Sequence, residues 1–116
     1  MNKETYKSEN RIQQECVIHF HNTYPELRGL LFAVPNGGAR SITEGLLLKK
    51  TGVVPGVSDM IFLYKGAAYL FELKTEKGTQ SEKQINWQKL VQKQGFKYFI
   101  IRSEIEFAAI VKLIIV

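Results

Sequence analysis

The amino-acid sequence predicts an α/β fold in which a mixed β-sheet is flanked by helices, in the order α-β-α-β-β-α-β-α. Segments in which apolar residues recur at helical spacing alternate with short apolar runs typical of strands. Three helix starts carry the Ser-x-x-Glu/Gln pattern of a capping box. Two neighbouring apolar runs are hydrophobic on both faces, which is typical of strands covered by helices on both sides. The length of 116 residues predicts one domain over residues 1–116.

The N-terminal part of the chain is expected to form a helix and then a short strand. Ile12, Cys16 and Phe20 recur at helical spacing and predict a helix over residues 8–23. A proline and a glycine soon afterwards end this helix. The apolar run of residues 30–34 then predicts a strand.

The next segment is expected to contain a turn, a helix and a loop. The Asn-Gly-Gly sequence of residues 36–38 predicts the turn. Ser41 and Glu44 form the first capping box, which opens a helix over residues 42–51. Residues 53–58 contain proline and glycine and predict a loop.

The other two capping boxes predict the last two helices. The box that begins at Ser81 opens a helix over residues 82–94. A strand is expected over residues 97–102, where four of the six residues are aromatic or aliphatic. The box that begins at Ser103 opens a helix over residues 104–113.

A predicted hairpin brings two acidic residues opposite each other. Its strands cover residues 59–64 and 67–74 and are joined by a turn that contains glycine. If the turn has two residues, Lys65 and Gly66, then Asp59 lies opposite Glu72, and Lys74 points to the same face as Glu72. Two opposed carboxylates need a divalent cation, a shared proton or a basic neighbour.

A hard divalent cation fits this arrangement because carboxylates suit Mg²⁺. Asp59 and Glu72 would bind the metal, the backbone carbonyl of Leu73 is a further possible ligand, and Lys74 could reach a water or a phosphoryl oxygen. An alternative stays open. If the turn lies one residue later, Asp59 faces Lys74 and the two form an ordinary cross-strand salt bridge.

Two further polar residues each have two interpretations. Gln84 lies near the start of its helix, where it either only completes the capping box or contacts the site. Glu15 flanks the apolar stripe of the first helix, where it is either a solvated acid or a third acid near the cation. His19 and His21 are two residues apart on a helix, so they point in different directions and do not form a zinc pair.

The charge balance favours a polyanionic partner. Sixteen Lys and Arg residues against eleven Asp and Glu residues give a net charge of +5. The basic residues that flank the proposed site in sequence, and could follow a phosphate backbone, are Arg40, Lys49, Lys50, Lys77 and Lys83. A single cysteine excludes an internal disulfide and a Cys-rich zinc site, and favours a reducing cytoplasm. We expect no signal peptide and no membrane span.

Three motifs together resemble the virus-type replication-repair nuclease (VRR-NUC) domain, a branch of the PD-(D/E)XK nuclease superfamily. The motifs are Pro55-Gly56-Val57-Ser58-Asp59, Glu72-Leu73-Lys74 and Ser81-x-x-Gln84-x-x-Trp87. The resemblance covers most of the chain and implies the restriction-endonuclease-like core of that superfamily. The chain departs from the pattern at one position, because Ser58 stands where the superfamily has the proline of its Pro-Asp pair.

The resemblance implies metal-dependent hydrolysis of phosphodiester bonds in DNA. It implies that Mg²⁺ or Mn²⁺ is held by Asp59, Glu72, the Leu73 carbonyl and Glu15. Lys74 matches the catalytic lysine and Gln84 the helix glutamine of the family. Glu15 matches the N-terminal helix acid of the superfamily.

Stand-alone members of this family are similar to endonucleases that cut branched DNA, including Holliday-junction resolvases that act as homodimers. The resemblance therefore implies a role in replication, repair or recombination in the cytoplasm of a bacterial or phage-infected cell. The apolar residues 108–111 and 113–116 could pair two subunits or could complete the core. Alternative functions are a nuclease acting on flap or nicked DNA, and a non-catalytic basic module that binds nucleic acid.

Overall fold

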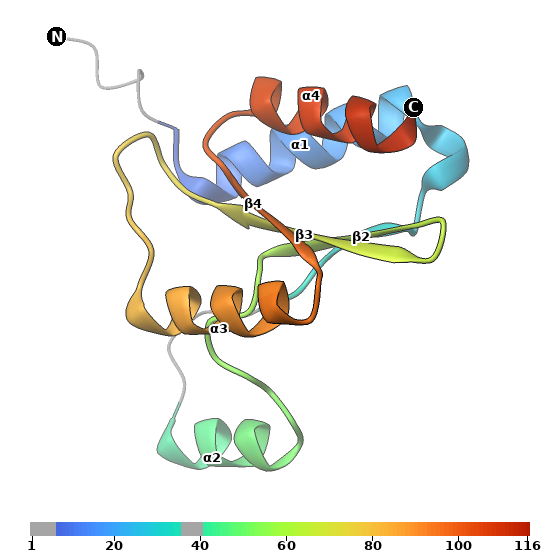
Figure 1. Ribbon diagram of the computed structural model, residues 1–116. Helices are drawn as coiled ribbons and strands as arrows, with labels where there is room; N and C mark the ends of the chain where they lie inside the picture. Colours follow the sequence, from blue (N-terminus) through green and yellow to red (C-terminus); the bar gives the residue numbers. More distant parts are fainter. Residues whose placement is uncertain (1–6, 36–40) are drawn as a thin grey trace, which may run out of the picture.

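The computed structural model describes residues 7–35 and 41–116, and the predicted turn at residues 36–38 lies outside these ranges. The elements follow the predicted order, with one additional 3₁₀ turn after the first helix (Figure 1). They are α1 (Glu9–Thr23), η2 (Pro25–Leu27), β1 (Leu31–Ala33), α2 (Ile42–Lys50), β2 (Met60–Tyr64), β3 (Ala67–Leu73), α3 (Glu82–Lys93), β4 (Lys97–Ile101) and α4 (Glu104–Ile115).

The strands form one mixed sheet, as the sequence predicts, and their order in it is β1-β2-β3-β4. β1, β2 and β3 are antiparallel neighbours, whereas β4 lies parallel to β3. A parallel pair needs a crossover connection, and α3 is the helix of that crossover. The β2–β3 turn consists of Lys65 and Gly66, both at positive φ (47° and 80°), as a type I′ hairpin turn requires.

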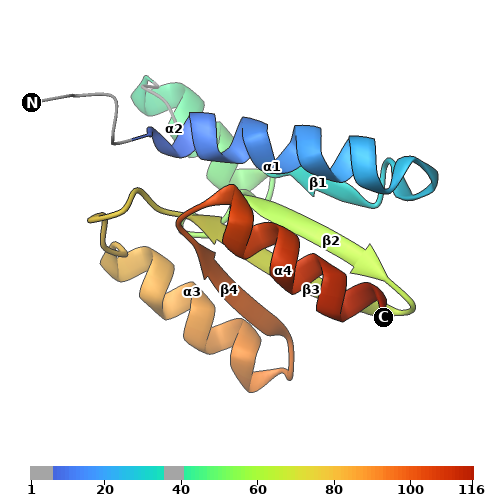
Figure 2. The ribbon, with the colours of Figure 1, turned by 90° about the horizontal axis from the view of Figure 1, so that it is seen from above.

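Helices cover both faces of the sheet, which explains why its strands are apolar on both sides. α1 and α4 lie against one face and α3 lies against the other (Figures 1 and 2). The main core fills the space between the sheet and the α1–α4 pair. Its buried members are Ile12, Cys16, Phe20, Leu31, Met60, Phe62, Phe71, Leu73, Ile101, Phe107 and Val111. Residues that alternate with these along β2 and β3 point to the α3 face.

The helix starts confirm serine caps and add one that the sequence analysis missed. Ser8 accepts a hydrogen bond from the backbone N–H of Arg11 and caps α1. The fully reciprocal capping box is found at Ser81. At Ser103 the serine accepts from the N–H of Glu106, but the Glu106 carboxylate accepts from the N–H of Arg102 instead of Ser103.

The last helix is two residues longer than predicted, because its end packs on the core. Ile114 and Ile115 are partly buried against the main core, so the helix continues past the predicted end at residue 113. None of the helices in the described ranges is both long enough and apolar enough to span a bilayer.

Candidate active site

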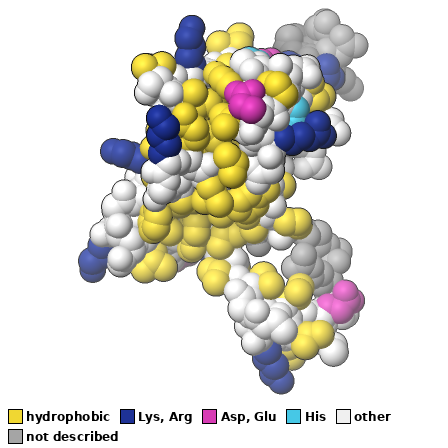
Figure 3. Space-filling model, turned by 90° about the vertical axis from the view of Figure 1, so that its right-hand side faces the viewer, with side chains coloured by type: hydrophobic (Ala, Val, Ile, Leu, Met, Phe, Trp, Pro, Cys, Tyr) yellow, Lys and Arg dark blue, Asp and Glu magenta, His cyan; other side chains and the backbone are white. Residues whose placement is uncertain are grey.

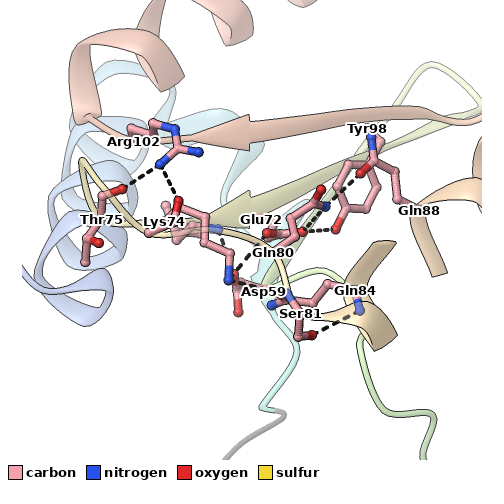
Figure 4. A network of polar contacts seen from close by, with 12 residues as sticks. Asp59, Glu72, Lys74, Thr75, Gln80, Ser81, Gln84, Gln88, Tyr98 and Arg102 are labelled. Carbon is pink, nitrogen blue, oxygen red and sulfur yellow. Dashed lines mark hydrogen bonds and ion pairs between the residues drawn. The ribbon is translucent and has the colours of Figure 1, made fainter. Parts of the chain in front are cut away.

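Asp59 lies at the rim of the sheet, directly before β2. Its backbone N–H donates to the Phe71 carbonyl at 3.0 Å, and its Oδ2 accepts from the Leu73 N–H at 2.7 Å. The paired register ends at Met60 and Phe71, and the bonds of Asp59 are offset from it by one residue, as at a β-bulge. They hold Asp59 at the end of β3, where its carboxylate lies near that of Glu72 (Figure 4). The predicted hairpin register is therefore confirmed over Met60–Tyr64, and the alternative register that opposes Asp59 and Lys74 is not adopted.

Glu72 is a fully buried carboxylate near the end of β3. Its Oε1 accepts hydrogen bonds from the Tyr98 hydroxyl and from Nε2 of Gln80, the latter at 2.9 Å (Figure 4). Its Oε2 lies 3.6 Å from Nζ of Lys74 and has no hydrogen-bond partner. A buried carboxylate oxygen without a donor is costly, so this atom indicates a place for a cation.

Lys74 directly follows β3, and its ammonium group lies near Oε2 of Glu72. Its side chain is buried, and Nζ donates to Oε1 of Gln84 at 2.8 Å. The same Gln84 oxygen accepts from the Ser81 backbone N–H at 2.8 Å. Gln84 therefore does more than complete the capping box of α3, because it also contacts Lys74 (Figure 4).

The surroundings of Asp59 disfavour its negative charge. Burial raises the pKa of Asp59 above its ordinary value, and the neighbouring carboxylates of Glu9 and Glu72 raise it further. The Leu73 N–H and the Lys74 ammonium act in the opposite direction but do not cancel the effect. A divalent cation beside Asp59 would reverse this balance by favouring the charged form.

A cleft of about 490 Å³ opens over Asp59. It lies between the N-terminal turns of α1, the end of β1 and the start of α3. Side chains that give it polar walls are Glu9, Asn10, Gln13, Asp59 and Gln84. The cleft gives a substrate access to the rim where Asp59 stands.

Glu15, the expected third acid, does not reach this cleft. It pairs with Lys7 at 2.8 Å and with Arg11 at 3.4 Å, and it lines a separate pocket with Glu104. The hydrogen bond from Lys7 is the main cause that lowers the pKa of Glu15. Glu9 is the α1 acid that faces Asp59. At about 100° per residue, Glu15 points about 120° away from Glu9 around the helix, which explains the misplacement.

The donor set fits a hard divalent cation. Within residues 7–35 and 41–116, no three Asp, Glu, His or Cys side chains lie close enough together to hold a metal. Mg²⁺ is ordinarily held by only one or two carboxylates together with waters and substrate phosphate. Asp59 and the unpartnered Oε2 of Glu72 meet that need. Tyr98 and Gln80, which hold the other Glu72 oxygen, were not predicted from the sequence.

Gly56 is the point where the loop before Asp59 touches α3. Its φ is +87°, and a Cβ at this position would lie 2.5 Å from the Lys83 carbonyl oxygen. The absence of a side chain thus lets the loop lie against the first turn of the helix that carries Gln84.

We expect Gly56→Ala to lower the free energy of unfolding by more than the roughly 1–3 kcal/mol that a positive φ alone costs a non-glycine residue. Gly66→Ala is the matched control, since Gly66 has a φ of +80° but open space around its Cβ position. Urea unfolding of both variants measures the difference. Equal losses in the two variants would show that the Lys83 contact has no energetic role.

The sheet topology and the positions of Asp59 and Glu72 define the class of fold. A mixed sheet with helices on both faces, and acids where β2 begins and β3 ends, is the restriction-endonuclease-like α/β fold. More particularly, the chain is similar to a solved structure described as "VRR_NUC domain protein", with a TM-score of 0.77 and 16% identity over 92% of this chain and 87% of that chain. It is also similar to one described as "VRR_NUC domain", with a TM-score of 0.58 and 19% identity over 90% of this chain and 94% of that chain.

The sequence itself matches no family model and no curated protein. The likeness is therefore one of fold. At this level it confirms the resemblance to VRR-NUC domains that the three sequence motifs indicate.

Proposed function

We propose that this protein is a divalent-metal-dependent endonuclease that hydrolyses phosphodiester bonds in DNA. The observation that carries the proposal is the meeting of Asp59, Glu72 and Lys74 at one rim of the sheet, where a buried Glu72 oxygen lacks a hydrogen-bond partner. The similarity in fold to two structures described as VRR_NUC domains supports it.

The proposed roles follow from the chemistry of the side chains. Asp59 and Glu72 would hold Mg²⁺ or Mn²⁺, with the Leu73 carbonyl as a further ligand. When bound, the metal supplies Lewis-acid activation of a water and neutralises charge on the phosphoryl group. Lys74 supplies a fixed positive charge to the water or to the phosphoryl oxygens, and Gln84 holds its ammonium group in place at 2.8 Å. Glu9, and not Glu15, is the α1 acid that lines the cleft with Asp59, and it would add negative charge near the metal without serving as a third ligand.

Branched DNA, such as a Holliday junction, is the proposed substrate. The experiment is a cleavage panel of junction, flap, nicked duplex, splayed arm, linear duplex and single strand, each with Mg²⁺, Mn²⁺ or a chelator. We expect junction cleavage with either metal and none with chelator. Preferential cleavage of flap or nicked DNA would favour the alternative nuclease. DNA binding without any cleavage would favour a non-catalytic basic module.

The basic residues that flank the site in sequence would assist DNA binding. Lys49 and Lys50 lie at the exposed end of α2, and Lys83 is exposed on the first turn of α3. Arg40 lies outside the described residues. Lys77 is exposed in the loop that follows Lys74. Affinity that comes from such phosphate contacts falls steeply as salt concentration rises.

We further propose that the protein acts as a homodimer, because symmetric cutting of a four-way junction needs two active sites. Of the C-terminal surface suggested by the sequence, Val111 is buried and Ile110 is partly buried, so that segment largely completes the core. α2 offers a better pairing surface. None of its side chains is buried, and an isolated nine-residue helix is marginal in water. Figure 3 shows hydrophobic side chains on this part of the molecule.

We expect the combined change Leu46→Glu and Leu47→Glu to convert the dimer to a monomer, because both side chains are more than half exposed on α2. Light scattering coupled to size exclusion measures the mass. Leu113→Glu is the control, at a position 77% exposed on α4. A monomer formed by the control alone would assign pairing to α4, and a monomeric unmodified protein would refute the dimer.

A further inference from the structure

The Glu72 carboxylate is held asymmetrically by groups other than Asp59 and Lys74. Two donors, the Tyr98 hydroxyl and the Gln80 amide, converge on one oxygen, Oε1. No donor bonds to Oε2, which faces Lys74 at 3.6 Å. The two oxygens of one buried carboxylate are thus assigned to different partners.

Packing and strand pairing hold the Tyr98 side chain in place beside Glu72. It is buried on β4, and its parallel pairing places it opposite Leu70, two residues before Glu72 on the same face of the sheet. The Trp87 ring of α3 packs edge-on against the Tyr98 ring, with 6.0 Å between the centroids. The hydroxyl therefore has a defined position from which to donate (Figure 4).

Gln80 uses its amide group as a bridge. Its Nε2 donates to Oε1 of Glu72 at 2.9 Å and to Oε1 of Gln88 at 2.7 Å. An amide nitrogen carries two hydrogens, so both are engaged. Because Gln88 belongs to α3, the bridge ties the Glu72 carboxylate to that helix.

The loop that carries Gln80 is itself held in place. Nη1 of Arg102 donates to the carbonyl oxygens of Thr75 at 2.8 Å and Gly78 at 2.7 Å. These bonds hold the loop after Lys74 in a defined conformation, from which Gln80 contacts Glu72 (Figure 4).

We propose that Tyr98 and Gln80 are positioning residues that orient Glu72 so that Oε2 is presented to the divalent cation. This inference rests on the proposed function. A carboxylate held at one oxygen by two donors cannot rotate to offer that oxygen, and its other oxygen keeps one direction. Partners of this kind ordinarily change metal affinity by about 10–100-fold when they are removed.

The test measures metal binding without DNA. Tyr98→Phe removes one hydroxyl and keeps the ring against Trp87, and Gln80→Leu removes the bridge. Calorimetric titration with Mn²⁺ is expected to give a Kd raised about 10–100-fold in either variant, and further in the double variant. Cleavage at saturating Mn²⁺ is expected to recover toward the unmodified rate, because the positioning residues do not touch substrate. Tyr64→Phe, at the hairpin end of β2, is the matched control.

The outcomes separate this inference from the proposed function. If the unmodified protein binds Mn²⁺ and cuts DNA, but Tyr98→Phe and Gln80→Leu bind Mn²⁺ with unchanged affinity, the positioning role is refuted and the nuclease remains. A lower melting temperature with unchanged Mn²⁺ affinity would indicate a purely structural role and would equally refute it. If the unmodified protein neither binds Mn²⁺ nor cuts DNA, both proposals fail.

Discussion

Replacing Glu72 with alanine or glutamine is expected to abolish DNA cleavage, with a rate loss of roughly 10³-fold or more. The change removes a metal-binding carboxylate, and a bound metal ordinarily contributes several kcal/mol to stabilising the transition state, where about 1.4 kcal/mol is a factor of ten. Glu72→Gln is the sharper variant. It keeps the side-chain volume and retains an oxygen that can accept from Tyr98 and Gln80. Glu72→Ala leaves those buried donors unpaired.

Single-turnover cleavage with Mg²⁺ measures the rate, and fluorescence anisotropy in chelator measures DNA binding. We expect DNA binding by Glu72→Gln to stay near that of the unmodified protein, whereas its melting temperature falls because the buried Lys74 ammonium loses its counter-charge. Glu15→Gln is the matched control, since it makes the same chemical change on α1 at a residue that pairs with Lys7 away from the cleft. Normal cleavage by Glu72→Gln would remove the basis of the site assignment.

The parts of the site that were predictable from the sequence are those fixed by local geometry. The Lys65-Gly66 turn sets the hairpin register, and this register brings Asp59 to the end of β3 that carries Glu72. Strand alternation then brings Lys74 to the same face. Gln84 was predictable to the extent that its capping box positions it at the start of α3.

The parts that were not predictable depend on contacts between distant segments. No turn sets the register of β4 against β3, so nothing in the sequence indicates that Tyr98 reaches Glu72. Gln80 lies in a loop whose path depends on Arg102, more than twenty residues later. The choice of Glu15 over Glu9 failed because helical periodicity identifies the buried stripe of α1 but not which flank of it faces Asp59.

The second large effect is expected from Lys74→Met, which separates catalysis from metal binding. Lys74 is 6% exposed and provides a positive charge 3.6 Å from Oε2 of Glu72. Without metal, the variant leaves a buried carboxylate without its counter-charge, and breaking such a pair ordinarily costs about 3–5 kcal/mol of folding stability. Mn²⁺ or Mg²⁺ would supply the missing charge. We therefore expect a lowered melting temperature in chelator and a larger metal-induced increase than in the unmodified protein.

The cleavage rate of Lys74→Met behaves differently from its stability. Because Lys74 is proposed to act on the water or the phosphoryl oxygens, its loss is expected to lower the single-turnover rate by about 10²–10³-fold even at saturating metal. Calorimetric Mn²⁺ affinity is expected to be unchanged or higher, since a competing cation has been removed. Lys89→Met, exposed on α3, is the control. A fall in metal affinity as large as the fall in rate would instead show that Lys74 acts by organising the carboxylates. If metal restores the stability of Lys74→Met but not its cleavage rate, the positive charge of Lys74 acts in the chemical step itself.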